Sequence, residues 1–283
     1  MLSSSRYTIL MVGDVFGQPG QDAIKGLLPR LIDQHEIDFV VVNGENANHG
    51  RGLTKNIAES FFQAGADVVT TGNHYFNSSS MFSWMDKDLR LIRPINYGEK
   101  VSGYGSTILQ SRRCNLRVGV INAVGKFMMA NSELPYDQVV QEAEHLRSQC
   151  DCIVVDFHAE ATSEKRLMGW LLDGKVSAVC GTHTHVQTAD EQILPQGTAY
   201  MTDLGMTGPH QSVIGLEVDV AYKRLTGSQP HLFEVATQDV RLCGALIEVE
   251  ASNPCMHEPS LDSTFLFDLF LKIFFILFSC GSF

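Results

Sequence analysis

The stretch Gly181-Thr182-His183-Thr184-His185 directly follows the apolar run Val176 to Cys180. Side chains alternate between the two faces of an extended segment, so His183 and His185 are predicted to point the same way and could hold one metal site together. Two histidines in a loop are also often solvated or hydrogen-bonded to backbone. The pair alone therefore leaves a metal site and an ordinary polar loop open.

Four other apolar runs end in carboxylate, amide or imidazole side chains. Buried strands of a parallel sheet are typically continuous apolar runs, and α/β proteins build their sites at the carboxyl edge of such a sheet. The repetition favours one site assembled from several strand ends. The runs and the residues that follow them are Ile9 to Val12 before Gly13-Asp14, Phe39 to Val42 before Asn43-Gly44-Glu45-Asn46, Val68 to Thr71 before Gly72-Asn73-His74, and Ile153 to Phe157 before His158.

Length and composition indicate one sizeable core. The chain has 283 residues, is 44% hydrophobic and contains no linker-like stretch, so we expect a single domain over residues 1–250 and an atypical apolar tail over 251–283. The formal net charge of −11 disfavours broad electrostatic binding to nucleic acid, and no stable nucleic-acid complex is expected. A small nucleotide remains open as a substrate.

The cysteines and the N-terminus indicate a compartment. The seven cysteines form no CxxC pair and no disulfide framework, and the first residues contain no apolar signal core. We therefore expect a reducing environment, the cytoplasm.

The remaining patterns predict helices and a second sheet. A helix should follow the turn at 17–20, with Pro29 kinking or ending it, and Thr54 should cap a helix that ends near Gly65. Ser163, preceded by Thr162, should cap a helix through Leu172, and residues 136–149 should also be helical. Residues 91–124 lack long helices, which favours a second sheet packed on the first. Beyond the strands named above, we expect strands at Leu91 to Ile95, Thr107 to Leu109, Leu116 to Ile121, Ala199 to Thr202, Val213 to Val218 and Leu242 to Val249.

Two segments leave alternatives open. In Asn48-His49-Gly50-Arg51-Gly52 the glycines would let backbone approach a ligand and Arg51 could meet a phosphate, but a solvated turn fits equally well. The apolar run Phe265 to Phe278, interrupted by Asp268 and Lys272, is too short for the ~20 residues of a membrane span. A docking helix, an oligomer contact and a poorly ordered terminus all remain open for it.

The strand-end motifs together resemble those of the calcineurin-like metallophosphoesterases. The longer blocks are similar to the YmdB-type branch of that superfamily over about residues 6–250, although the branch has Trp-Asp where this chain has Phe76-Asn77. These blocks are Gly13-Asp14-Val15-Phe16-Gly17, Asn43-Gly44-Glu45-Asn46, residues 156–165 (DFHAEATSEK) and residues 181–190 (GTHTHVQTAD).

The resemblance implies a four-layer αββα sandwich and a dinuclear metal centre. One metal would be held by Asp14, Glu45, Asn46 and His185, and the other by Glu45, Asn73, His158 and His183. Glu45 would bridge the two ions, and Asn46 would replace the histidine that the superfamily carries at Phe16. Carboxylate, amide and imidazole ligands suit iron, manganese or zinc better than copper, and the resemblance favours iron.

The implied activity is hydrolysis of small nucleotide phosphodiesters, above all 2′,3′-cyclic nucleotides. Two ions about 3.5 to 4 Å apart can share a hydroxide nucleophile and neutralise the phosphoryl oxygens. His74, next to Asn73, is predicted to diverge toward substrate and to protonate the leaving oxygen, because imidazole titrates near neutral pH. The alternative is a histidine that only orients a ligand. We also expect a homo-oligomer without a membrane span.

Two rival functions remain at this point. One is another dinuclear hydrolase, such as a phosphomonoesterase or a nuclease, and the other is a non-enzymatic regulator that binds metal or nucleotide. Turnover on a panel of phosphate esters separates the first rival from the phosphodiesterase. Nucleotide binding without turnover would indicate the second.

Overall fold

The computed structural model describes residues 5–77, 81–251 and 273–279. Its first sheet has strand order β10-β11-β1-β2-β3, with β12 paired to β11. Within it, β1, β2 and β3 are parallel, and β11 runs antiparallel to β1. The strands are β1 (Ser5–Val12), β2 (Phe39–Asn43), β3 (Val68–Thr70), β10 (Gly208–Pro209), β11 (Val240–Ala251) and β12 (Ile273–Ser279).

The second sheet has strand order β4-β5-β6-β7-β9-β8. Its central strands β5, β6, β7 and β9 are parallel, and the edge strands β4 and β8 are antiparallel to their neighbours. This mixed sheet confirms the second sheet predicted from residues 91–124. Its strands are β4 (Ser106–Gln110), β5 (Arg117–Val124), β6 (Cys152–His158), β7 (Ala178–Thr182), β8 (Gln192–Ile193) and β9 (Ala199–Met201).

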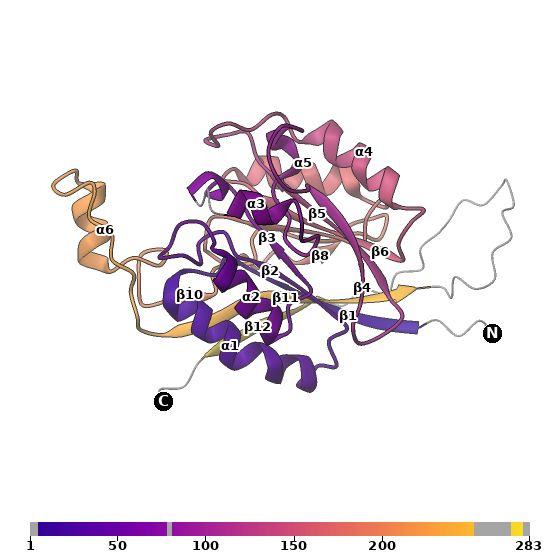
Figure 1. Cartoon of the computed structure of the whole chain (residues 1–283), viewed down its shortest axis with the longest axis horizontal. Helices are drawn as coiled ribbons and strands as arrows, with labels where there is room; N and C mark the ends of the chain where they lie inside the picture. Colours follow the sequence, from indigo (N-terminus) through magenta and orange to yellow (C-terminus); the bar gives the residue numbers. More distant parts are fainter. Residues whose placement is uncertain (1–4, 78–80, 252–272, 280–283) are drawn as a thin grey trace, which may run out of the picture.

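Helices cover the outer face of each sheet, so the molecule has four layers, αββα (Figure 1). The alternation of strand side chains explains the layering. In β1, Ile9 and Met11 lie in the core between the sheets, while Leu10 and Val12 pack against the helices. The first sheet is covered by α1 (Gly17–Gln34) and α2 (Lys55–Ala64), and the second by α4 (Tyr136–Leu146) and α5 (Thr162–Leu172). The predicted sandwich is therefore confirmed.

Several local predictions hold and others are wrong. Thr54 caps α2, its hydroxyl accepting from the Ile57 N–H at 3.4 Å, and Gly65, with φ +117°, caps the C-terminus of α2. In contrast, α1 continues past Pro29 to Gln34. The cap of α5 is Ala161, without a side-chain hydrogen bond, and Thr162 is already helical. The described residues also include the short helical segments η1 (Tyr75–Asn77), α3 (Phe82–Met85), η3 (Ile95–Tyr97) and α6 (Val218–Leu225).

Two predicted strands do not form. Leu91 and Ile92 make only isolated bridges, because the chain then turns around the buried Arg93 guanidinium, which donates to carbonyls including those of Pro94 and Gly98. Residues 213–218 also make only isolated bridges, since Gly215 has φ +105° and α6 begins at Val218. Positive φ is incompatible with a continuous strand.

The described part of the C-terminal tail is a strand. Residues 273–279 pair antiparallel with β11, from Ile247↔Ile273 to Arg241↔Ser279. The helix interpretation is therefore wrong for this segment, whose β-branched and aromatic residues favour extended structure. Asp268 and Lys272 lie outside the described residues. Among the described helices, none has the length and apolar character needed to cross a membrane.

Candidate metal centre

The carboxyl ends of β1, β2, β3, β6 and β7 meet at one edge of the two sheets. Because these strands are parallel within each sheet, the polar residues that follow them converge. Asp14, Glu45 and His158 are buried, with exposed fractions of 0%, 1% and 0%. The predicted ligands at this edge are Asp14, Glu45, Asn46, Asn73, His158, His183 and His185, and each of them contacts another member of the set or its backbone.

One half of the edge is centred on the His158 ring. Its Nε2 lies 2.9 Å from Asn73 Oδ1, 3.1 Å from His183 Nδ1 and 3.6 Å from Glu45 Oε1. The other half pairs His185 Nε2 with Asn46 Oδ1 at 3.2 Å. Asp14 contacts the first half twice, because its Oδ2 accepts from the His183 N–H at 3.0 Å and its Oδ1 lies 3.5 Å from His158 Nδ1.

The two histidines of the 181–185 stretch do not share an extended segment. β7 ends at Thr182, and His183 and His185 have φ of +100° and +65°. The predicted geometry is therefore wrong, because the chain leaves the strand before the first histidine. His183 turns to His158 and His185 turns to Asn46, so the pair spans the two halves instead of holding one point together.

A buried network that the sequence did not reveal orients His158. The Thr182 hydroxyl donates to Asp156 Oδ1 at 2.7 Å, so its oxygen can accept from His158 Nδ1 at 3.0 Å. That arrangement leaves Nε2 with its lone pair facing the site. Asn43 donates to Asp156 Oδ2 at 2.9 Å, which joins β2 to the same network. Asp156 and Asn43 lie inside or directly after apolar runs, and their polarity there was the available signal.

Glu160 orients the second ring. Its Oε2 lies 3.0 Å from His183 Nε2, which leaves the Nδ1 of His183 facing His158. The backbone N–H of His74 donates to Glu45 Oε1 at 2.7 Å. The oxygens and ring nitrogens that face the site are thus held by contacts behind them, as metal ligands are in proteins.

Two carboxylate oxygens at this edge, Asp14 Oδ1 and Glu45 Oε2, are buried and have no hydrogen-bond partner among the residues that the structure describes. Burial raises the pKa of Asp14 to about 7 and that of Glu45 well above its ordinary value. Burial also lowers the pKa of His158 well below its ordinary value and that of His183 to about 4. Neutral imidazoles beside orphaned carboxylate oxygens form a donor set that a divalent cation would satisfy.

Each half of the edge pairs a histidine with an amide, and the His158 half also contains the carboxylates of Asp14 and Glu45. Within the described residues, no three His, Cys, Asp or Glu side chains form a metal-binding group by themselves. Asn46 and Asn73 are the amides that contact His185 and His158. The residues fit a cation centre only when both amides are included.

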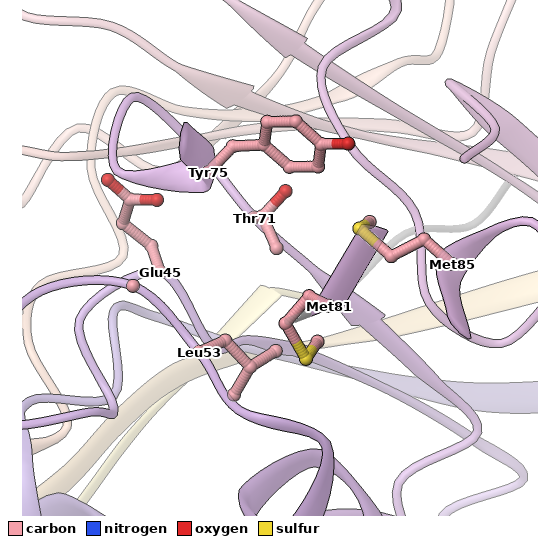
Figure 2. Close-up of a pocket in the computed structure, with 7 residues that line it drawn as sticks. Glu45, Leu53, Thr71, Tyr75, Met81 and Met85 are labelled. Atoms are coloured by element: carbon pink, nitrogen blue, oxygen red, sulfur yellow. The ribbon is translucent and has the colours of Figure 1, made fainter. Parts of the chain in front are cut away.

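Glu45 is backed by apolar side chains. A cavity of about 10 Å³, no larger than one water needs, lies beside it. Figure 2 shows the Glu45 carboxylate on one side of this space and Met81 and Met85 on the other. These buried neighbours exclude water, which accounts for the raised pKa of Glu45.

A larger cavity of about 330 Å³ opens over the opposite side of the edge. His74 lies on its wall together with Arg51, which is exposed to solvent. Burial and the nearby Arg51 lower the pKa of His74, while a hydrogen bond with Asn77 raises it. Asn77 thus contacts His74 at the position where the YmdB-type branch has Asp. The lining residues are Phe16, Asn46, Gly50, Arg51, His74, Glu160, His183, Thr184, His185, Ile214, Leu216, Arg224 and Phe233.

The αββα fold with this polar edge defines an α/β protein of the metallophosphoesterase type. The chain belongs to the YmdB-like protein family, whose sequence profile matches residues 10–258. A 2′,3′-cyclic-nucleotide 2′-phosphodiesterase of Bacillus subtilis is 42% identical over 245 residues, covering 86% of this chain and 91% of that protein. This family membership confirms the resemblance inferred from the motifs.

Two crystal structures are similar over nearly the whole chain. A hypothetical protein from Thermus thermophilus has a TM-score of 0.82 at 31% identity, covering 95% of this chain and 99% of that chain. A structure described as a novel phosphatase from Mycoplasma pneumoniae has a TM-score of 0.82 at 30% identity, covering 98% of this chain and 95% of that chain. The relatives with an assigned activity are thus hydrolases of phosphate esters.

Proposed function

We propose that this protein is a metal-dependent phosphodiesterase that hydrolyses small nucleotide phosphodiesters, with 2′,3′-cyclic nucleotides as its best substrates. The observation that carries the proposal is the pair of orphaned oxygens, Asp14 Oδ1 and Glu45 Oε2, beside imidazoles of which His183 lines the large cavity. The similarity to the Bacillus subtilis phosphodiesterase supports the substrate class.

Two metal ions, iron foremost and manganese or zinc as alternatives, would occupy the edge. Asp14, Glu45, Asn46 and His185 would hold one ion, and Glu45, Asn73, His158 and His183 the other. When bound, such ions neutralise phosphoryl charge and supply an activated water for in-line displacement. The mixed oxygen and nitrogen donors, without a thiolate, support these metals over copper.

The protein's own groups would bind and protonate the substrate. Arg51 and His74 share the cavity wall, where the guanidinium can pair with a phosphoryl oxygen that the metals leave free. The His74 backbone N–H donates to Glu45 Oε1, and its imidazole would then lie beside the reacting phosphate. His74 would then donate a proton to the departing ribose oxygen.

The size and charge of the site support a small substrate. A cavity of about 330 Å³ suits a mononucleotide, near the lower limit for ligand pockets. The formal net charge of −11 opposes binding of a long polyanion. A polymeric nucleic acid is therefore a poorer substrate in this proposal.

The test is a comparison of kcat/KM on four substrates with the metal-loaded protein: a 2′,3′-cyclic nucleotide, a 3′,5′-cyclic nucleotide, a nucleoside monophosphate and single-stranded RNA. The cyclic 2′,3′ diester should be cleaved fastest. Faster cleavage of the monophosphate or of RNA would establish the rival hydrolase. Nucleotide binding without turnover by protein that contains metal would establish the regulator.

We further propose a cytoplasmic location, a homo-oligomer and a single domain over residues 1–250. The described cysteines, including Cys180 and Cys243, are free thiols, which supports a reducing compartment. Exposed apolar side chains on α6, among them Val218, Tyr222 and Leu225, support association between copies. Light scattering of the full chain should give a mass above 31.3 kDa. A mass equal to one chain would reject the oligomer.

A further inference from the structure

The outer wall of the large cavity comes from an arm formed by residues 212–236, which carries α6. In Figure 1, α6 projects from the body at the left. From this arm, the half-buried Phe233 ring returns to the cavity and stacks on Phe16, with centroids 6.4 Å apart and planes at 23°. Two guanidinium groups also lie over Phe233: Arg51 at 4.9 Å and Arg224 at 5.3 Å from its centroid.

Backbone glycines make room for these rings. Gly50 has φ +82°, and a Cβ there would lie 2.6 Å from the Phe233 ring and 2.8 Å from the Phe16 ring. At Gly215, with φ +105°, a Cβ would lie 2.5 Å from the Phe16 ring. Any larger residue would displace an aromatic ring, so this wall is a specific packing arrangement.

Arg224 joins α6 to the returning segment of the arm. Its Nη1 donates to the Leu232 carbonyl at 3.2 Å, next to Phe233. The guanidinium therefore fixes the segment that carries the ring and also contributes its own flat face to the wall. Phe16 connects this wall to the metal edge, since it makes an edge contact with His185 at 5.4 Å.

We propose that Phe233, flanked by Arg51 and Arg224, is the nucleobase subsite, on which the base stacks while the phosphodiester lies at the metal edge. The inference rests on the proposed function. An aromatic ring among guanidinium groups binds bases through their π-faces and makes little use of base-specific hydrogen bonds. The site should therefore accept all four bases and prefer purines, which stack over a larger area.

The test compares adenosine 2′,3′-cyclic phosphate with methyl ribofuranoside 2′,3′-cyclic phosphate, which lacks a base. Wild-type kcat/KM should favour the nucleotide by about tenfold, mainly through KM. Phe233→Leu should remove that preference by raising KM for the nucleotide only, and Phe233→Tyr should retain it. Arg224→Met is a second variant, and it should raise the KM for the nucleotide several-fold.

The control is Tyr222→Ala, an aromatic residue of the same arm that is 67% exposed and does not line the cavity. It should leave both substrates unaffected. Equal KM values in the wild type, or an equal loss on both substrates in Phe233→Leu, would overturn the subsite while the proposed function stands. Failure of the wild-type, metal-loaded protein to hydrolyse either substrate would overturn both.

Discussion

The ammonium of Lys165 lies 2.6 Å from the carboxylate of Asp203, and both side chains are almost completely buried. The same Asp203 oxygen accepts from the backbone N–H and the hydroxyl of Thr184, at 3.1 and 2.7 Å. Thr184 separates His183 from His185. The buried ion pair therefore holds the loop that carries two of the proposed ligands, and it does so in a conformation with positive φ at both histidines.

Replacement of Lys165 should destabilise the protein and displace this loop. Lys165→Met leaves the Asp203 carboxylate buried without its cation, at a cost of about 3–5 kcal/mol in the free energy of unfolding. Lys175→Met is the matched control, because the Lys175–Glu144 pair is exposed and should contribute no more than about 1 kcal/mol. Denaturant unfolding of the two variants measures the difference.

A double variant separates the stability effect from the loop effect. Lys165→Met combined with Asp203→Leu removes both buried charges and should recover much of the stability. Because Thr184 then loses its acceptor, metal affinity should stay reduced. A double variant with wild-type metal affinity would show that the pair contributes stability alone.

Removal of Glu45 should reduce metal content. As the proposed bridging carboxylate, Glu45 would bind both ions. The metal content of the Glu45→Ala variant should therefore fall from two equivalents per chain toward one or none. Elemental analysis of protein purified without oxygen gives the number, and Glu144→Ala serves as an exposed carboxylate control. Unchanged metal content in Glu45→Ala would reject the bridging role.

Loss of His74 should remove acid catalysis while retaining metal. His74→Asn should lower kcat by about 10² to 10⁴ for poor leaving groups and largely spare substrates whose leaving group needs no proton. The control is His49→Asn, an exposed histidine at φ +51°, which asparagine tolerates. An equal loss with good and poor leaving groups, or a lost metal, would contradict the assignment.

The pKa of His74 also predicts how kcat depends on pH. The pKa of His74 lies below its ordinary 6.5, chiefly because of burial. As the proposed general acid, His74 would act in its protonated form. Activity on poor leaving groups should therefore fall as pH rises through that lowered pKa, on the acidic side of neutrality. The pH profile of His74→Asn should lack this limb.

The C-terminal tail should be dispensable for catalysis. Truncation after Ala251 removes β12, which β11 separates from β1, and removes no proposed ligand. The kcat/KM of the truncated chain should equal that of the full chain. A soluble but inactive truncation, or one with a changed oligomeric mass, would make β12 a structural or interface element.

Much of the candidate site could be predicted because the polar residues that form it lie at the ends of apolar runs. Asp14, Asn73 and His158 each follow or end a run that can only be a buried strand, and parallel pairing brings such ends to one edge. The sandwich could be predicted for the same reason. The predicted strand at 213–218 does not form, because Gly215 takes a positive φ where it packs closely against the Phe16 ring. That contact is tertiary, so the local sequence does not reveal it.

Local pattern thus determined the central strands of both sheets and the polar residues at their ends, since continuous apolar runs encode burial directly. Only the tertiary structure decided what those residues face. The turn of His183 toward His158, the pairing of Lys165 with Asp203 and the return of Phe233 to Phe16 join segments far apart in the chain. Their geometry depends on side-chain packing between layers, and residue spacing along one strand carries no information about it.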